Sequence, residues 1–380
     1  MDFTFHMPVQ VFSGPGCVGE RADLLRGLGR RCLVMFGGRG ARESGALDDV
    51  LDALRRAGVD ATLFPGVGQN PLVSQCQQAA GAAEICRADF VVGVGGGSVM
   101  DAAKAAAWLA ANRVEDTARL FAGTLRRPPL PLVLVGTTAG TGSEVSPTAV
   151  LTLDMDMPGL GGAGCKKSVT HPRCYARYAF ADPRYTAAMP RGTTVSTALD
   201  ALSHAVEGYC NPACGDVAAA CAEKALPLIS GGLCWLAENP GLLPDAALRE
   251  ELLYGSLWAG LVLNAMGTAY PHPFGYILTE DFGIPHGMAC AVFLPSLSRR
   301  AEAFAPERAH RLFALCGGRA AYYGMLEALI DAPVSMTEAA VRAYARRWTG
   351  LKNLARTPGG FSAEEGERLF IELFVPRQEA

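Results

Sequence analysis

The first half of the chain alternates short apolar runs with segments of helical spacing. The runs that have the length and branched side chains of buried strands lie at 31–36, 61–65, 89–94 and 131–136. Apolar residues at helical intervals occupy the segments between them, at about 45–57, 71–87 and 98–111. Strands that alternate with helices predict right-handed crossovers and a parallel sheet, which binds ligands at the carboxyl ends of its strands.

After about residue 185 the apolar spacing becomes helical in almost every segment, and no pattern typical of a strand follows. The clearest helices are predicted at 193–209, 216–237 and 246–266. Two prolines, Pro183 and Pro190, interrupt the pattern near the change. We therefore predict a Rossmann-like α/β domain over residues 1–185 and an all-helical domain over residues 186–380.

Composition narrows the class of protein. With 380 residues, of which 50% are hydrophobic and 19% charged, the chain can form two domains with large cores. The net charge of -3 and the lack of a long basic run argue against nucleic-acid and anionic-membrane partners. No run reaches the roughly 18 apolar residues of a membrane span, and the opening MDFTFHMPVQ does not resemble a secretory signal. The twelve cysteines include no C-x-x-C pair, so we interpret them as reduced, buried thiols of a cytoplasmic protein rather than a metal or redox centre.

Two glycine-rich loops follow predicted strands. In VVGVGGGSVMDAAK, Gly95, Gly96 and Gly97 allow a tight turn, and Ser98 with Asp101 has the spacing of a capping box at a helix start. Free N–H groups at such a start suit a diphosphate, although an ordinary strand-to-helix turn has the same pattern and the strict G-x-G-x-x-G motif is absent.

The second loop, GTTAGTGSEVSPTAV at 136–150, is dense in small hydroxyl residues. Thr137, Thr138, Thr141 and Ser143 offer hydrogen-bond donors to a cofactor, while a polar connecting loop would have the same composition. Two such loops, each after a strand of one sheet, together favour a nucleotide site.

The helical half contains a candidate metal site. Asp200 and His204 are four residues apart in DALSHAVEGY, so on a helix a carboxylate and an imidazole share one face. His272 in PHPFG and His286 in IPHGMA come next to proline and glycine. Taken singly, the pair could only stabilise a helix, and the other two could be core or surface histidines. Together, a carboxylate and three imidazoles suit Fe(II), Zn(II) or Mn(II).

At this point the chain resembles the iron-containing (group III) alcohol dehydrogenase family. The resemblance rests on the order and spacing of HMPVQVFSGPGCVGE, GGGSVMDAAK, GTTAGTGSE, ADPRYT, DALSHAVEGY and IPHG followed by Leu294-Pro295. It implies a nucleotide-binding α/β domain joined to an all-helical metal-binding domain, as in dehydroquinate synthase-like architectures. It also implies a metal-dependent oxidoreductase that transfers hydride between NAD(P)(H) and a small alcohol or aldehyde, commonly as a homo-oligomer such as a dimer.

The resemblance assigns roles to individual residues. The ligands of one Fe(II), or alternatively Zn(II), would be Asp200, His204, His272 and His286. The residues around the cofactor diphosphate would be Gly95, Gly96, Gly97, Ser98 and Asp101. Those along the cofactor towards the nicotinamide would be Thr137, Thr138 and Thr141.

Two positions depart from the family pattern. Tyr276 stands where many members have a further histidine proposed as a proton relay, and a phenol with a pKa near ~10 is a poorer relay at neutral pH. Gly37 ends the first strand, where NAD-preferring members often have an acidic residue, and Arg39 and Arg42 follow. Guanidinium groups without a carboxylate favour the 2′-phosphate of NADP over NAD, unless both arginines are simply solvated.

Other functions fit the same architecture. A dehydroquinate synthase-like lyase matches DALSHAVEGY and IPHGMA less well, and a glycerol dehydrogenase-like enzyme is a closer alternative. A catalytically silent protein that binds nucleotide or metal is the third alternative, against which the intact ligand set argues.

Overall fold

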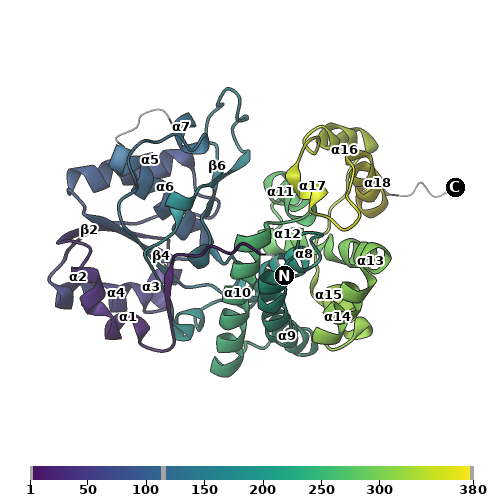
Figure 1. The fold of residues 1–380 in the computed structure, drawn as a ribbon, viewed down its shortest axis with the longest axis horizontal. Coiled ribbons are helices and arrows are strands. Elements are labelled where there is room, and N and C mark those ends of the chain that lie inside the picture. The colour runs from purple at the N-terminus through teal and green to yellow at the C-terminus, as the bar shows by residue number, and fades with distance from the viewer. Residues whose placement is uncertain (1–2, 113–116, 377–380) are drawn as a thin grey trace.

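A computed structural model describes residues 3–112 and 117–376. The N-terminal part is built on a six-stranded parallel sheet with strand order β1-β8-β5-β4-β2-β3. The C-terminal part is helical throughout its described residues, and the two parts lie side by side (Figure 1). The predicted fold class is confirmed.

The strands are β1 (Gln10–Ser13), β2 (Arg31–Phe36), β3 (Asp60–Phe64), β4 (Phe90–Gly95), β5 (Leu132–Gly136), β6 (Thr148–Thr152), β7 (Lys166–Thr170) and β8 (Tyr178–Ala181). The helices of the N-terminal part are α1 (Cys17–Glu20), α2 (Ala22–Arg26), α3 (Gly40–Glu43), α4 (Ala46–Ala57), α5 (Val73–Ile85), α6 (Gly97–Asn112) and α7 (Ala118–Phe121), with short 3-10 turns η1 (Ser143–Val145), η2 (Pro172–Cys174) and η3 (Pro183–Thr186).

The helices of the C-terminal part are α8 (Arg191–Tyr209), α9 (Asp216–Glu238), α10 (Ala246–Met266), α11 (Pro271–Phe282), α12 (His286–Ala291), α13 (Leu294–Phe304), α14 (Pro306–Leu315), α15 (Arg319–Leu329), α16 (Glu338–Ala345), α17 (Lys352–Ala355) and α18 (Ala363–Phe374). The last strand of the sheet ends at Ala181 and the first long helix after it begins at Arg191. A domain boundary near residue 185 stays a prediction.

The central strands are apolar on both faces because helices cover both faces of the sheet. In β4, Val91 packs into one core cluster with α5 and α6, while Phe90 and Val92 pack into another with α1 to α4. This burial explains why β2, β4 and β5 read as continuous apolar runs. β1, β8 and the antiparallel hairpin β6–β7 were not predicted. Half-buried or exposed positions interrupt the apolar pattern of β1 and the hairpin, whereas β8 is buried throughout but only four residues long.

The start of α6 differs from the prediction. The helix begins at Gly97, one residue before Ser98, so Ser98 lies inside its first turn rather than at its N-cap. The Ser98 hydroxyl instead accepts a hydrogen bond from the Asn70 backbone N–H, at 3.3 Å. The predicted capping box between Ser98 and Asp101 is therefore wrong.

Helix α8 is the centre of the helical part. It contacts α9, α10 and α12, and the residues of its middle turns are almost all buried. Helix α9 is long and apolar enough to cross a membrane by length and composition, but half of that stretch is buried in the described structure, as in the core helix of a soluble protein.

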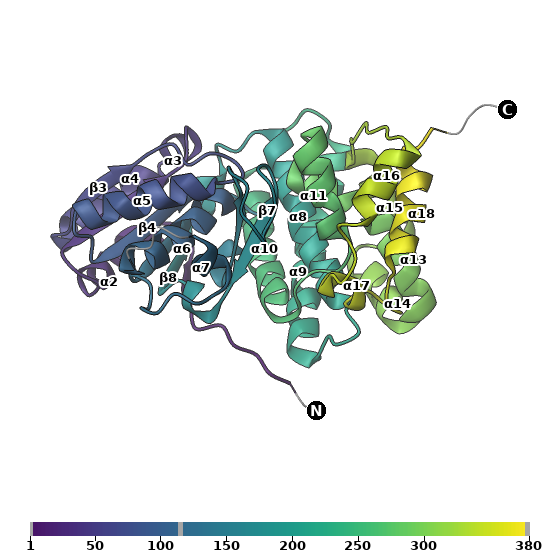
Figure 2. The same cartoon turned by 90° about the horizontal axis from the view of Figure 1, so that it is seen from above.

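The two parts meet at the second glycine-rich loop. A Cβ on Gly142 would collide with the backbone of Gly260 in α10, and one on Gly140 would collide with Thr197 in α8. Both glycines therefore let the loop after β5 lie directly on the helical part. The β6–β7 hairpin also borders that part (Figure 2), and the Lys166 N–H donates to the Glu280 carboxylate of α11 at 3.0 Å.

Candidate metal and cofactor site

Helix α8 presents a carboxylate and an imidazole on one buried face. Asp200 and His204 are both buried, and only 4% of the surface of each residue is exposed. Their spacing of four residues places both side chains over the same turn. The burial of an acidic side chain so far inside a helical core requires a compensating partner.

Two further helices bring histidines to this face. His272 lies in the first turn of α11, and His286 is the first residue of α12. A Cβ on Gly287 would collide with the Ser196 carbonyl oxygen and lie 2.8 Å from the Asp200 Cβ, so only glycine lets the start of α12 come this close to α8.

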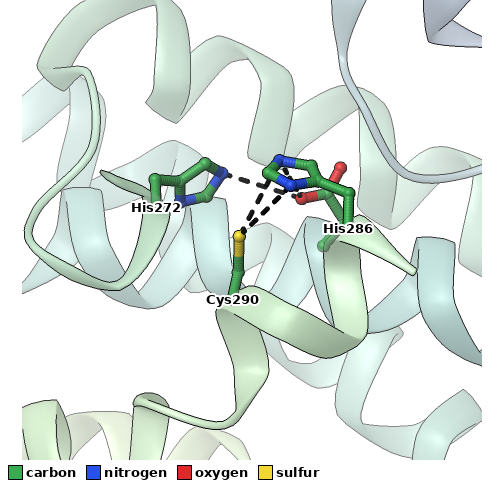
Figure 3. Close-up of side chains that lie close together, drawn as sticks. His272, His286 and Cys290 are labelled. Carbon is green, nitrogen blue, oxygen red and sulfur yellow. Dashed lines mark hydrogen bonds and ion pairs between the residues drawn. The ribbon is translucent and has the colours of Figure 1, made fainter. Parts of the chain in front are cut away.

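The four side chains converge on one point. The Asp200 Oδ1 atom lies 3.9, 3.7 and 3.8 Å from the Nε2 atoms of His204, His272 and His286, respectively. The Nε2 atoms of His204 and His272 are 2.9 Å apart. Figure 3 shows His272 and His286 facing the same space from different helices.

Two buried atoms of this group lack a hydrogen-bond partner among the described residues, namely Asp200 Oδ1 and His204 Nδ1. An unsatisfied buried carboxylate oxygen costs free energy, so its persistence calls for a ligand. The distances from Asp200 to the three imidazoles are those of atoms that share a metal ion through bonds of about 2.0–2.2 Å. The residues present therefore fit a divalent cation.

Glu207 supports this arrangement, although the sequence analysis did not identify it. Its Oε1 lies 2.6 Å from His272 Nδ1, and its Oε2 accepts the Ala269 N–H at 2.7 Å. A carboxylate at Nδ1 holds the proton there and leaves Nε2 free to bind a metal. Its position three residues after His204 in DALSHAVEGY, on the same face of the helix, could have indicated this role from the sequence.

The charges of the group are strongly coupled. Although burial alone would raise the pKa of Asp200, the nearby imidazoles lower it. Burial lowers the pKa of His204 to about 4 and that of His286 to about 3, against the opposing effect of Asp200. Burial opposes charge on His272 as well, but Glu207 and Asp200 together raise its pKa to about 10.

Three other side chains border the group, and of these only Tyr276 was expected near it from the sequence. The ring of Tyr276 stacks on that of His286, with centroids 5.4 Å apart. The Lys166 ammonium lies 5.7 Å from the Tyr276 ring centroid. Cys290 follows His286 by four residues and points into the same space (Figure 3).

The candidate cofactor edge lies where the strand order reverses. β3 lies outside β2 on one side, whereas β4 and β5 continue on the other, so the carboxyl ends of β2 and β4 form a switch point. Gly37 follows β2, and Gly95 ends β4 with a φ of 159°. Arg39, also predicted at this edge, has a side chain that is 92% exposed, and its Nε lies 3.9 Å from Glu43 Oε1.

The two glycine-rich loops touch each other at this edge. A Cβ on Gly96 would lie 3.1 Å from Thr138 Oγ1, and one on Gly97 would lie 2.8 Å from Thr141 Oγ1. The structure thus places Gly96 and Gly97 against Thr138 and Thr141, while Gly95 and Thr137 are buried.

Asp101 differs from the other predicted cofactor residues. Its carboxylate accepts hydrogen bonds from the Ser143 hydroxyl at 2.6 Å and the Val150 N–H at 2.9 Å. The Lys104 ammonium donates to Ser143 at 2.6 Å and to the Thr148 carbonyl at 2.7 Å. These bonds fasten α6 to the second loop, and the role of Asp101 in diphosphate binding stays a prediction.

Comparison with known families covers most of the chain. Residues 8–183 match the family model described as iron-containing alcohol dehydrogenase. Residues 194–342 match the model of the C-terminal part of the Fe-containing alcohol dehydrogenase family.

Individual proteins agree with this match. The chain is 33% identical over 340 residues to a 1,3-propanediol dehydrogenase of Klebsiella pneumoniae, which covers 88% of this chain and 84% of that protein. An iron-containing alcohol dehydrogenase structure from Thermotoga maritima superposes with a TM-score of 0.88 at 32% identity, over 98% of this chain and 99% of the other. A sulfoacetaldehyde reductase from Bifidobacterium kashiwanohense, solved with NAD+, has a TM-score of 0.85 at 26% identity over 98% and 99% of the two chains.

Proposed function

This chain belongs to the iron-containing alcohol dehydrogenase family, and from that premise we propose that Asp200, His204, His272 and His286 hold one divalent cation. The protein is an oxidoreductase that acts on CH–OH groups, interconverting an alcohol and its aldehyde with a nicotinamide cofactor. The observation that carries the metal proposal is the buried, unpartnered Asp200 Oδ1 among three imidazoles.

A bound cation would act as a Lewis acid that polarises the substrate oxygen and stabilises negative charge on it. The chain's own residues prepare the place for this. Helix α8 fixes Asp200 and His204, while Glu207 orients the ring of His272. His286 leaves 30% of its side chain exposed, so a small substrate has access from that side.

For the cofactor, we propose that the diphosphate lies on Gly95 to Ser98, at the start of the helix that Asp101 fastens to the second loop, and that Thr137, Thr138 and Thr141 line the path to the nicotinamide. The contact between the two loops supports this placement, and the Bifidobacterium relative was solved with a nicotinamide cofactor, NAD+. We propose NADP over NAD, because Gly37 offers no carboxylate to the ribose and Arg39 is exposed beside it.

We further propose a small primary alcohol or aldehyde as the substrate, iron or zinc as the metal, a homo-oligomer such as a dimer, and a cytoplasmic location. Iron is the metal named for the family, while the donor set of one carboxylate and three imidazoles also suits zinc.

The test is a panel of aldehydes assayed with NADH and NADPH after the chelated protein is reloaded with Fe(II) or Zn(II). We expect steady oxidation of the reduced cofactor, which a lyase would not give, and loss of both metal and turnover in His286→Ala. His310→Ala, on the exposed face of α14, is the matched control. A metal-free His286→Ala protein with full turnover would refute the mechanism, and cofactor binding without turnover on the whole panel would favour a silent protein.

Cofactor choice has its own test. In Gly37→Asp, the new Cβ would lie 3.3 Å from the Val67 carbonyl and from Val99, which is tight but tolerable. A carboxylate there would repel a 2′-phosphate and accept the ribose hydroxyls. We expect the ratio of kcat/KM for NADPH to that for NADH to fall by about 10- to 100-fold. An unchanged ratio would contradict a role for this position.

A further inference from the structure

Cys290 is the only cysteine of the described residues whose sulfur belongs to a compact group of possible metal donors. All twelve cysteines lie within the described ranges and all are free thiols. The donor atoms of Asp200, His272, His286 and Cys290 all lie within 4.8 Å of one another. Cys290 itself is fully buried.

The distances are those of a shared ion. The Cys290 Sγ lies 3.8 Å from Nδ1 and 3.7 Å from Nε2 of His286. A Zn–N bond of about 2.1 Å and a Zn–S bond of about 2.3 Å allow nitrogen and sulfur ligands of one ion to lie up to roughly 4.4 Å apart. The sulfur therefore lies within the range of an ion shared with His286.

Local structure explains this position. His286 and Cys290 are four residues apart in α12, so both side chains lie on the face that packs against α8 and α11. Gly275 of α11 makes room for the thiol, because a Cβ there would lie 2.9 Å from the sulfur. Within the group, the unpartnered Asp200 Oδ1 independently indicates that a cation is missing from its surroundings.

We propose that Cys290 supplies a sulfur ligand to the bound cation when that cation is zinc, so that the centre has a preference for zinc that the Asp-plus-three-His set alone would lack. The proposal rests on the metal site proposed above. Thiolate is a soft donor that selects zinc, whereas carboxylate and imidazole accept iron and zinc alike. Zinc accommodates four or five ligands, so in the substrate-free protein the sulfur would take the position that the substrate oxygen occupies during turnover.

X-ray absorption at the zinc edge tests the contact directly. In the zinc-loaded, cofactor-free protein we expect one sulfur neighbour at about 2.3 Å in addition to nitrogen and oxygen neighbours at about 2.0–2.2 Å. Cys290→Ala should lose the sulfur neighbour and keep the others. Cys221→Ala, which removes another buried thiol from α9, is the matched control and should keep the sulfur. A wild-type spectrum with nitrogen and oxygen neighbours only would overturn the proposal.

Competition between metals provides the second measurement. We expect Cys290→Ala to weaken zinc binding by about tenfold or more relative to Fe(II) binding, since changes to groups that only orient ligands already cost 10- to 100-fold. An equal effect on both metals would overturn the stated preference. If His286→Ala keeps its metal, the proposed metal site itself is wrong. If His286→Ala loses its metal but the wild-type spectrum shows no sulfur neighbour, the metal site stands and only the role of Cys290 is wrong.

Discussion

The molecule contains two buried polar clusters that differ in how well they are satisfied. In the α/β part, the Ser143 hydroxyl lies 2.6 Å from both Lys104 and Asp101, which are themselves 3.5 Å apart, and both charged groups also bond to backbone at 2.7–2.9 Å. In the helical part, Asp200 faces its imidazoles at 3.7–3.9 Å, and its Oδ1 has no hydrogen-bond partner among the described residues. Both clusters are charged, and both lie beside a glycine-rich contact.

The difference separates structure from function. A buried charge whose hydrogen bonds are complete contributes to the position of the elements that carry it, here α6 and the loop after β5. A buried carboxylate without hydrogen bonds destabilises the folded protein unless a ligand supplies the missing interaction. By this criterion the first cluster holds the fold together and the second binds something absent from the chain.

The largest expected effect comes from Asp200→Asn, which keeps the shape of the side chain and removes its charge. We expect the metal to be lost and kcat/KM for an aldehyde to fall by about 1000-fold or more, the equivalent of the several kcal/mol that a Lewis acid supplies. Stability in the presence of a chelator should fall only modestly, because the His272 imidazole loses Asp200 but keeps the Glu207 carboxylate beside it. Metal analysis, kinetics and denaturant unfolding check the three points, and full metal content with normal turnover would break the comparison.

Lys104→Ala should give the opposite pattern. The Lys104 side chain is fully buried, and Asp101 is 14% exposed at its side chain. Removing the ammonium leaves the carboxylate without its buried counterion, so we expect unfolding to become easier by about 3–5 kcal/mol. Metal content per folded molecule should stay normal. Denaturant titration measures the loss, and a stability change below about 1 kcal/mol would show that this cluster is dispensable for the fold.

A bound metal should stabilise the folded protein through the Asp200 cluster and not through the Lys104 cluster. Because an ion that binds the folded state alone stabilises it by mass action, zinc at 100 times its Kd should raise the free energy of unfolding by about 2.7 kcal/mol. Thermal unfolding with and without chelator measures this increment. It should vanish in Asp200→Asn and persist in Lys104→Ala. The same increment in both variants would mean that the ion binds elsewhere.

The cofactor edge and the metal centre also differ in how far sequence predicts them. Gly95 to Gly97 follow an apolar run and precede a helix, so a local pattern predicts both the turn and its place at a sheet edge. The metal centre depends on Asp200 and His286 meeting from helices far apart in the chain, which no local pattern predicts. The resemblance to a family, not the spacing, assembled that set.

What the sequence did not predict has a physical reason. The hairpin β6–β7 alternates between buried and exposed positions, so its apolar signal is weak, and its Lys166 reaches a site formed by other elements. Cys290 was one of twelve scattered thiols until α12 was packed against α8 and α11. The hydrogen bonds of Asp101 run from helix α6 to Ser143 and Val150, and the helix starts at Gly97, so Ser98 and Asp101 do not form the capping box that their spacing predicted.

Glu207→Gln gives the smallest effect and probes the border between the two kinds of cluster. Glu207 is hydrogen-bonded like the first cluster but acts on a residue of the second, since one oxygen meets His272 Nδ1 and the other accepts the Ala269 N–H. Glutamine has a single acceptor oxygen, so either the Ala269 N–H loses its partner or an amide N–H faces His272 and drives the ring proton to Nε2.

We expect metal affinity to fall by about 10- to 100-fold in this variant, with the metal-saturated protein retaining its fold. Glu223→Gln is the matched control, because that carboxylate also accepts two hydrogen bonds, from Tyr209 and Arg311, but lies on the surface side of α9. Titration with a metal-sensitive chelator measures both variants. Unchanged affinity in Glu207→Gln would show that the His272 ring is held by packing alone, and that the carboxylate belongs with the structural cluster.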